Sequence, residues 1–238
     1  MISVAILGAS GRMGSLTRDL VDADPNLKLH AALGSGSDLS MMLGADVVVD
    51  FTLPDISPKM VSFAIDNDLK IVVGTSGWSE AKLAGVEKQL VDHPKAAVVV
   101  VPNFSIGSML LQRFSAEAAK HFGSVEIIEA HHAGKVDSPS GTAIATAERI
   151  AAAQSENQLV PGAGQQARGD IHKGVPIHSL RQPGVSAKQD VIFGGDAEQL
   201  TISHDVSSHR AYSLGILRSI EYANANSGLV VGLENVLN

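Results

Sequence analysis

Short runs of β-branched and aliphatic residues alternate with longer segments of helical pattern through the first hundred residues of this 238-residue chain. This alternation is typical of βαβ units, whose strands are buried on both faces and lie in a parallel sheet. The predicted strands are Val4–Leu7, Leu27–Leu33, Val47–Thr52, Ile71–Thr75 and Ala97–Val101, and the predicted helices are Arg12–Asp22, Ser57–Asn67 and Ser79–Val91.

The pattern changes after Asn103 and predicts an α+β arrangement with a mixed or antiparallel sheet. A last helix, Tyr212–Asn224, is expected to return to the first domain, so the predicted domains are residues 1–104 with 212–238, and residues 105–211. Within the second domain we expect helices near 107–121 and from Thr142, a loop at Gln154–Gly174, and strands at Val125–His131, Val175–Leu180, Lys188–Phe193 and Leu200–His204.

Composition excludes several classes of protein. The chain has no cysteine, which removes thiolate nucleophiles, thiolate metal sites and disulfide bonds. A formal net charge of −7 does not indicate a nucleic-acid-binding protein. The longest uncharged run, residues 96–112, is interrupted by proline, asparagine and glycine, and no basic export segment opens the chain. We expect a soluble, cytoplasmic protein with neither a nucleic-acid nor a membrane partner.

A glycine-spaced turn follows the first predicted strand directly and leads into the first predicted helix. Gly8 permits a tight turn, Gly11 lets backbone N–H groups approach a pyrophosphate, and Gly14 allows close packing of helix on strand. Arg12 is a candidate contact for the pyrophosphate or for a 2′-phosphate. Leu33 is followed by Gly34 rather than by the acid that usually binds the adenosine ribose, so the choice between NADH and NADPH stays open.

Two later junctions are predicted at the same sheet edge, because open α/β sheets bind ligands at the carboxyl ends of their strands. Gly74, Thr75 and Ser76 follow the fourth predicted strand, and residues 101–104 follow the fifth. Together with the first turn they predict a site for the nicotinamide and its ribose.

The segment 129–142 combines two histidines, a lysine and a predicted helix start at Ser140. The N–H groups of Gly141 and Thr142 are expected to face the same space as Lys135, which predicts a site for a small carboxylate. A nearby cation would disfavour the ammonium of Lys135 and make it a usable acid. Asp137 is expected to have a structural role, as a partner of Lys135 or of a neighbouring chain. Adjacent histidines on a strand point to opposite faces, so no metal site is predicted.

Five motifs together resemble the 4-hydroxy-tetrahydrodipicolinate reductase family, also called dihydrodipicolinate reductase. They are G-A-S-G-R-M-G, D-F-T-x-P at Asp50–Pro54, V-G-T-S-G, P-N-F-S-I-G and E-A-H-H-x-x-K-x-D-S-P-S-G-T-A, and the likeness runs from residue 2 to about residue 233. The resemblance implies a Rossmann-like parallel sheet domain plus an α+β domain with a mixed sheet. It also implies an oxidoreductase of lysine and diaminopimelate biosynthesis that is a homotetramer, uses NADH or NADPH and binds a dicarboxylate substrate.

The resemblance also assigns roles to individual residues. His131 matches the proton donor/acceptor and Lys135 the donor lysine, whereas the carboxylate contacts match His132, Gly141 and Thr142, with Ser140 at the head of the helix. The matching cofactor contacts are Gly8, Ala9, Ser10, Gly11, Arg12, Met13, Gly74, Thr75, Ser76, Val101, Pro102, Asn103 and Phe104.

Four positions depart from the family pattern. The family has an acid where this chain has Gly34, a basic residue in place of Leu53, a second histidine in place of Gly134 and an arginine in place of His209. Three of these departures remove positive charge around a dianionic substrate. Arg210 and Arg168 are candidates to replace that charge.

Two other functions are compatible with the residues. One is an NAD(P) dehydrogenase of the same fold that acts on another small anion, and the other is a catalytically weak nucleotide-binding regulator.

Overall fold

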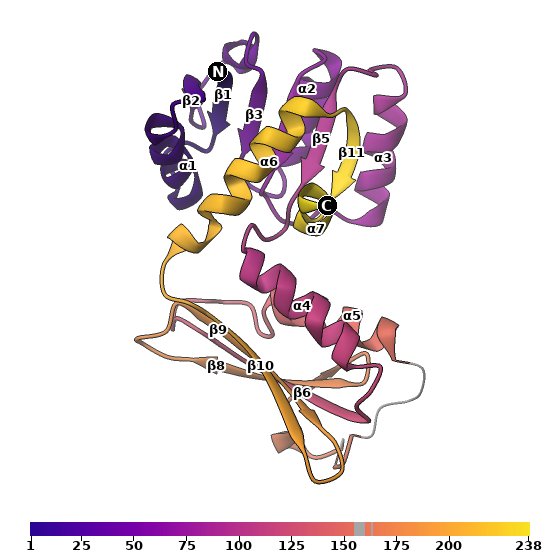
Figure 1. Ribbon diagram of the computed structural model, residues 1–238. Helices are drawn as coiled ribbons and strands as arrows, with labels where there is room; N and C mark the ends of the chain where they lie inside the picture. The colour runs from indigo at the N-terminus through magenta and orange to yellow at the C-terminus, as the bar shows by residue number, and fades with distance from the viewer. Residues whose placement is uncertain (155–159, 163) are drawn as a thin grey trace. The chain divides into compact units, whose positions relative to one another are not determined.

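The computed structural model describes residues 1–154, 160–162 and 164–238, which form two compact units (Figure 1). Unit 1 comprises Met1–Ile106 and His209–Asn238, and unit 2 comprises Gly107–Ser208. The two helices predicted around this division are observed as α4 (Ile106–Ala118) and α6 (Ser213–Ala225). Across the described residues, no helix is both long and apolar enough to cross a bilayer.

Unit 1 contains a six-stranded sheet in the order β11-β5-β4-β3-β1-β2, in which every pairing is parallel. Its α/β fold confirms the predicted class. The strands are β1 (Ile2–Leu7), β2 (Leu27–Leu33), β3 (Val47–Asp50), β4 (Lys70–Val73), β5 (Ala97–Val100) and β11 (Gly228–Val231), and the helices are α1 (Arg12–Ala23), α2 (Ser57–Asp66), α3 (Glu80–Leu90), α6 and α7 (Leu233–Leu237), with 3-10 turns at Leu39–Met42 and His209–Tyr212.

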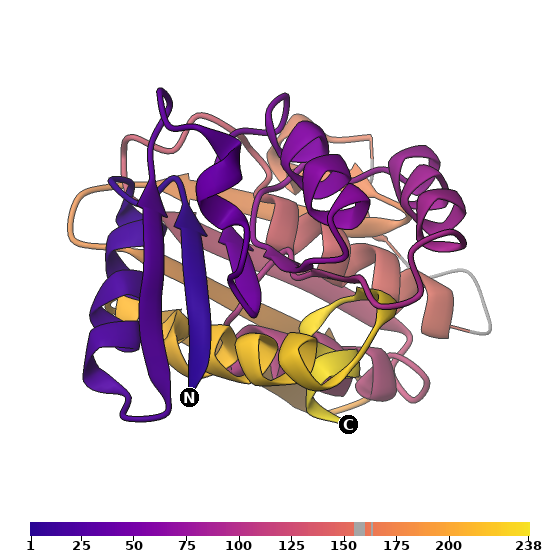
Figure 2. The ribbon, with the colours of Figure 1, turned by 90° about the horizontal axis from the view of Figure 1, so that it is seen from above.

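Helices cover both faces of this sheet. Helices α2 and α3 contact each other, α1 contacts α6, and both α2 and α6 contact the central strands (Figure 2). The central strands are buried on both faces, because alternate residues face the two helical layers. The core formed with α2 and α3 includes Val48, Ile65, Ile71, Val73 and Val98.

The sequence analysis missed strand β11, which pairs with β5 at one edge of the sheet. It has only four residues, Gly-Leu-Val-Val, and an apolar run this short does not by itself distinguish a strand from other structure. The predicted strands at 47–52 and 71–75 are longer than β3 and β4, because their last residues already belong to loops.

Unit 2 contains a five-stranded mixed sheet in the order β10-β9-β6-β8-β7, as predicted for this half. Strands β6 and β8 are parallel, and the other pairings are antiparallel. Its strands are β6 (Ser124–His131), β7 (Asp170–His172), β8 (Val175–Arg181), β9 (Ala187–Gly194) and β10 (Gln199–Val206), and its helices are α4 and α5 (Gly141–Ala153).

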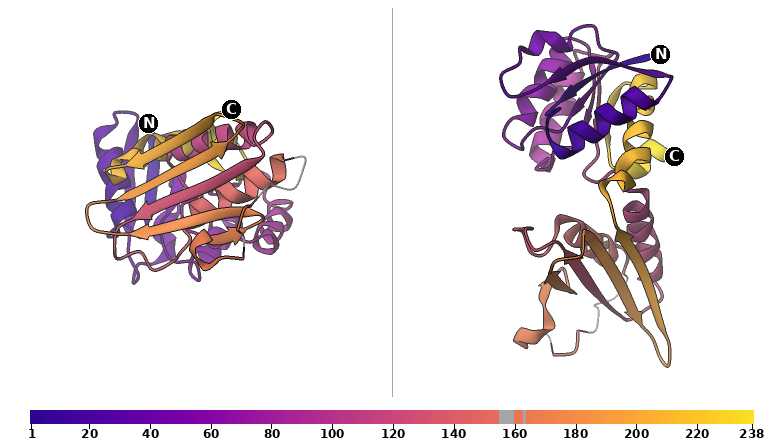
Figure 3. Two further views of the ribbon diagram at one scale, coloured as in Figure 1. Left: turned by 90° about the horizontal axis from the view of Figure 1, so that it is seen from below. Right: turned by 90° about the vertical axis from the view of Figure 1, so that its left-hand side faces the viewer.

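One face of the unit 2 sheet packs against α4 and α5 around a core that includes Leu111, Ile127, Ile150 and Phe193. The strands seen from the opposite side lie in front of these helices (Figure 3, left). The loop predicted at 154–174 is wrong at its end, where Gln166–Arg168 forms a 3-10 turn and β7 pairs with β8. Residues 155–159 and 163 of that prediction lie outside the described residues.

Candidate active site

The turn after β1 is built from glycines that no larger residue could replace without moving backbone. Gly8 has a φ of +72°, and a Cβ atom there would lie 2.4 Å from the Phe51 carbonyl oxygen. A Cβ atom on Gly14 would lie 2.2 Å from the Gly8 carbonyl oxygen. These contacts account for the tight turn and the close helix packing expected from the spacing.

Helix α1 begins in a way that leaves room for an anion. Gly11 is its N-cap and offers no side chain to bond the first N–H groups, and the first turn carries no acid. Those N–H groups have no acceptor inside the helix, and they carry the positive end of its dipole. The amides of Gly8 and Ala9 are occupied, because both donate to the Leu33 carbonyl. The amides of the first turn of α1 are therefore the donors available to a pyrophosphate.

The later junctions meet the same edge of the unit 1 sheet. Gly74 lies between two aromatic rings, and a Cβ atom there would lie 2.2 Å from the Phe51 ring and 2.8 Å from that of Phe104. The two rings pack edge to face with centroids 5.7 Å apart. Since β5, β4, β3 and β1 are parallel neighbours, their carboxyl ends form one continuous edge.

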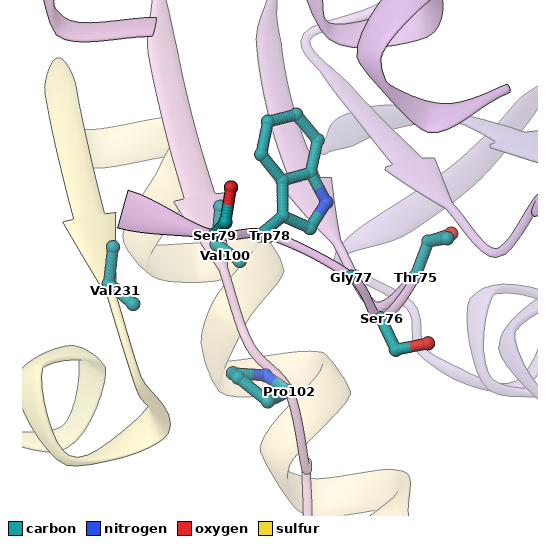
Figure 4. A pocket seen from close by; sticks show the side chains of 8 residues that line it. All are labelled: Thr75, Ser76, Gly77, Trp78, Ser79, Val100, Pro102 and Val231. Atoms are coloured by element: carbon teal, nitrogen blue, oxygen red, sulfur yellow. The ribbon is translucent and has the colours of Figure 1, made fainter. Parts of the chain in front are cut away.

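A cavity of about 450 Å³ opens at this edge, beside β4, β5 and β11 (Figure 4). Its lining includes Thr75, Ser76, Trp78, Val100, Pro102 and Val231. In Figure 4 the Thr75 and Ser76 side chains lie on one side of the cavity and Val231 on the other. The volume is typical of a small-molecule site.

Burial divides the predicted cofactor residues into two groups. The side chains of Ala9, Val101 and Phe104 belong to the core and leave only backbone groups for a ligand, and Thr75 is also buried, with its hydroxyl donating to the Asp50 carbonyl over 3.4 Å. The exposed or partly exposed members are Gly8, Ser10, Gly11, Arg12, Met13, Gly74, Ser76, Pro102 and Asn103.

The predicted corner at 129–142 is observed in unit 2. Strand β6 ends at His131, and Ser140 caps α5 by accepting a hydrogen bond from the Ala143 amide over 3.2 Å. Gly141 and Thr142 occupy the first turn, where backbone N–H groups precede the first intrahelical bond. His132 and Gly134 are exposed, and His132 lies where the chain leaves the strand.

Lys135 pairs with Asp137, as one of the two partners that the sequence allows for that carboxylate. Its Nζ donates to Asp137 Oδ1 over 2.7 Å, so the neighbour is a carboxylate rather than a cation. This hydrogen bond is the main cause that lowers the pKa of Asp137. The structural role expected for Asp137 is therefore an ion pair with Lys135.

The sequence analysis assigned no role to Glu129 or Arg181. Glu129 is fully buried, and its carboxylate accepts two hydrogen bonds from Arg181, each 2.9 Å long. It also lies 2.6 Å from His131 Nδ1. Glu129 was visible only as an acid inside an apolar strand, and Arg181 lies 52 residues further along the chain, where no local pattern connects the two.

Burial and charge act on both partners of this contact. Burial lowers the pKa of His131, although Glu129 opposes that shift. Burial acts to raise the pKa of Glu129, but the hydrogen bonds and charge of Arg181, with the hydrogen bond to His131, outweigh it and hold this pKa below its ordinary value. The favoured state is an ionised Glu129 beside a neutral His131.

Of the two arginines considered as replacements for lost charge, Arg168 is already bound. It forms an ion pair with Glu126 and donates to the Pro161 carbonyl. Arg210 lies in the exposed turn before α6. No group of three or more His, Asp or Glu side chains within the described residues is arranged to hold a metal ion.

The comparisons with known proteins cover the whole chain. The family model described as dihydrodipicolinate reductase, N-terminus, matches residues 2–104, and the one described as dihydrodipicolinate reductase, C-terminus, matches residues 107–237. The 4-hydroxy-tetrahydrodipicolinate reductase of Clavibacter sepedonicus is 45% identical over 99% of this chain and 86% of its own length. That of Cutibacterium acnes is 44% identical over 100% of this chain and 99% of its own length.

A solved structure agrees with these relatives. Dipicolinate-bound dihydrodipicolinate reductase from Paenisporosarcina sp. TG-14 superposes with a TM-score of 0.86 at 33% identity, and the match covers 99% of both chains. With both halves of the chain matched in order, the protein belongs to the dihydrodipicolinate reductase family.

Proposed function

We propose that this protein reduces 4-hydroxy-tetrahydrodipicolinate to tetrahydrodipicolinate in lysine and diaminopimelate biosynthesis, with NADH or NADPH as the reductant. The observation that carries the proposal is the corner at 129–142, where a histidine, a lysine and a helix N-terminus meet beside the end of β6. Relatives at 44–45% identity over nearly the whole chain bear the name of this activity. The proposed location is the cytoplasm, where reduced nicotinamide nucleotides are available.

The cofactor residues fit a dinucleotide. The spaces beside Gly8 and Gly14 are too small for a Cβ atom, which brings backbone close to the first turn of α1, and that turn has unused N–H donors. The residues proposed to hold the cofactor are Gly8 to Met13, Gly74 to Ser76 and Val101 to Phe104. When bound, the nicotinamide supplies the hydride.

The corner of unit 2 has the groups that the remaining chemistry needs. His131 and Lys135 are proposed to deliver the proton that completes the reduction. The proposed carboxylate contacts are His132, Ser140, Gly141 and Thr142, because backbone N–H groups and the helix dipole at the start of α5 favour an anion. Arg181 adds no free charge here, since its guanidinium already binds Glu129.

We further propose that the protein forms a homotetramer through the sheet of unit 2. Leu180 is 41% exposed on that sheet, and Ile128 and Ile192 are partly exposed. Among the described residues, both helices of unit 2 belong to the core on the other face. A face of this kind is a candidate for self-association. The mass in solution of native protein and of Leu180→Glu tests the proposal, because a tetramer should dissociate in the variant.

Steady-state reduction of enzymatically prepared substrate, followed at 340 nm with NADH and NADPH in turn, tests the activity. We expect turnover with both nucleotides. If the nucleotides bind but neither is consumed, the protein is a nucleotide-binding regulator. Turnover only with another small anion would indicate a different dehydrogenase of the same fold.

A further inference from the structure

Glu129 makes four polar contacts although it has no exposed surface. Two are the paired hydrogen bonds from Arg181, and a third is the Ser140 amide, which donates over 3.2 Å to Oε1. The fourth is His131 Nδ1 at 2.6 Å from Oε2. A buried carboxylate is costly unless its oxygens are satisfied, so this set of partners keeps Glu129 ionised in the fold.

These contacts join the parts of the corner that the proposed function uses. Arg181 also donates from Nη2 to the Asp137 carbonyl over 2.7 Å, which attaches the loop between β6 and α5 to strand β8. The Ser140 amide fixes the N-cap of α5 to the same carboxylate. One buried acid therefore sets the position of both the imidazole and the helix start.

We propose that Glu129, held by Arg181, is the positioning residue for His131. Its carboxylate accepts a hydrogen bond from Nδ1–H and leaves Nε2 as the nitrogen that exchanges a proton with substrate. This assignment deepens the proposed function and rests on it. A hydrogen bond at one imidazole nitrogen determines which tautomer is present, so the carboxylate selects both the orientation and the reactive atom of His131.

The charges around His131 come from three segments. Glu129 on β6 favours the imidazolium, whereas burial, Lys135 in the loop and Arg181 on β8 disfavour it. On β9, which is the second strand that pairs with β6, the residue opposite His131 is the uncharged Ala187. With Asp137 included, these side chains carry two positive and two negative charges. Protonation of His131 therefore gives the corner a net positive charge for an anionic substrate.

The same strand provides a matched control on its other face. Glu126 binds an arginine and a histidine as Glu129 does, through the Arg168 ion pair and a 2.7 Å contact with His178 Nε2. Residues an odd number apart on a strand point to opposite faces. Glu126→Gln therefore removes a comparable carboxylate from β6 without touching His131.

The experiment compares Glu129→Gln, Arg181→Gln and Glu126→Gln in the full chain. The pH dependence of kcat is measured for each variant, and NMR of the 15N-labelled imidazole nitrogens gives the tautomer and the titration of His131. In native protein we expect neutral His131 to carry its proton on Nδ1. Loss of the Glu129 charge should move the His131 titration to lower pH, and loss of the Arg181 charge should move it to higher pH.

Activity should follow the same signs. We expect kcat of Glu129→Gln to fall by roughly 10–100-fold at pH 7.5 and to recover in part at lower pH. The reason is that moving the His131 titration down by one pH unit lowers the protonated fraction of His131 about tenfold. KM should change less than kcat. Glu126→Gln should keep the native pH profile, with its mass in solution measured alongside because Glu126 lies on the same face as Ile128.

Three results would overturn the assignment: a proton on Nε2 in native neutral His131, displacements of the same sign in the Glu129 and Arg181 variants, or an equal displacement in Glu126→Gln. If Glu129→Gln does not fold, the upward displacement in Arg181→Gln decides alone. Failure of the proposed function has a different signature, since native protein would then lack turnover while the NMR experiment still reports the tautomer.

Discussion

The two halves of the candidate site are built in different ways. In unit 1 the turn after β1 uses backbone, with glycines that exclude a Cβ atom and a helix start without a capping side chain. In unit 2 the corner after β6 uses side-chain charge, because Glu129 binds Arg181 and Asp137 binds Lys135. A backbone site is encoded by local spacing, whereas a charge network depends on residues that only the fold brings together.

Removal of the lysine should have the largest effect, because it takes away the proposed general acid of the unit 2 corner. Lys135→Ala should lower kcat by on the order of 10²–10⁴ if the ammonium acts as general acid. Cofactor affinity should stay near the native value, since Lys135 belongs to unit 2. Steady-state kinetics and nucleotide titration check both expectations, and near-native kcat would remove Lys135 from the mechanism.

A single added methyl group in the turn after β1 should weaken nucleotide binding in unit 1. Gly14→Ala places a Cβ atom where the Gly8 carbonyl stands, and the shift required should cost about 1–3 kcal/mol, or roughly 5–150-fold in nucleotide affinity. Calorimetric titration with NADH measures the loss.

Gly85→Ala is the matched control for that substitution. Gly85 lies within α3 with nothing inside 4 Å of its Cβ position, so the variant should gain about 0.5–1 kcal/mol of stability and keep its affinity. Equal losses of affinity in the two variants would show that the turn has no special role.

Cofactor preference should respond to an acid at the end of β2. The Gly34 amide already donates to Ser37 Oγ over 3.0 Å, and the nearby acid, Asp38, caps the next 3-10 turn. Gly34→Glu should favour NADH over NADPH by about tenfold through repulsion of the 2′-phosphate. The ratio of kcat/KM for the two nucleotides measures this, and an unchanged ratio would place the ribose elsewhere.

The smallest effect concerns stability against pH. Burial lowers the pKa of His131 and of His204 in unit 2, so the unfolded chain binds more protons than the fold below about pH 6.5. This contribution to stability is complete above pH 6.5 and is lost as the pH falls toward the folded-state values.

Unit 1 should not share that loss. The acids with lowered pKa there, Asp38 and Asp46, lose their contribution only at lower pH, below their ordinary value of 3.8. Hydrogen exchange corrected for intrinsic rates, measured in peptides of each unit at pH 7 and pH 5.5, should show the protection of unit 2 falling first. If protection in unit 1 fell first, the pH dependence could not be assigned to His131 and His204.

Sequence alone predicted much of the fold because most elements have a local signature. The buried strands of unit 1 are apolar runs, and Ser79 and Ser140 cap helices where expected. Strand β11 was missed because its partner β5 lies about 130 residues earlier, and its own four apolar residues are too few to predict a strand without that partner.

The site divides in the same way. Gly8 and Gly14 were recognisable because their spacing reflects contacts within one turn. The pair of Lys135 and Asp137 could be named as an alternative because the two residues are close in sequence, but only side-chain direction in the loop decides that it forms. Arg181 reaches Glu129 only because β8 lies parallel to β6, and that pairing cannot be inferred from either segment by itself.

The position of β11 has a consequence for synthesis of the chain. Val231 lines the cavity beside Val100, and Gly215 of α6 packs so tightly against Phe104 that a Cβ atom there would lie 2.0 Å from the Phe104 carbonyl oxygen. The ribosome makes all of unit 2 between these partners. A nascent chain that has emerged only as far as residue 210 therefore lacks one wall of the cavity and the helix that supports its neighbouring loop.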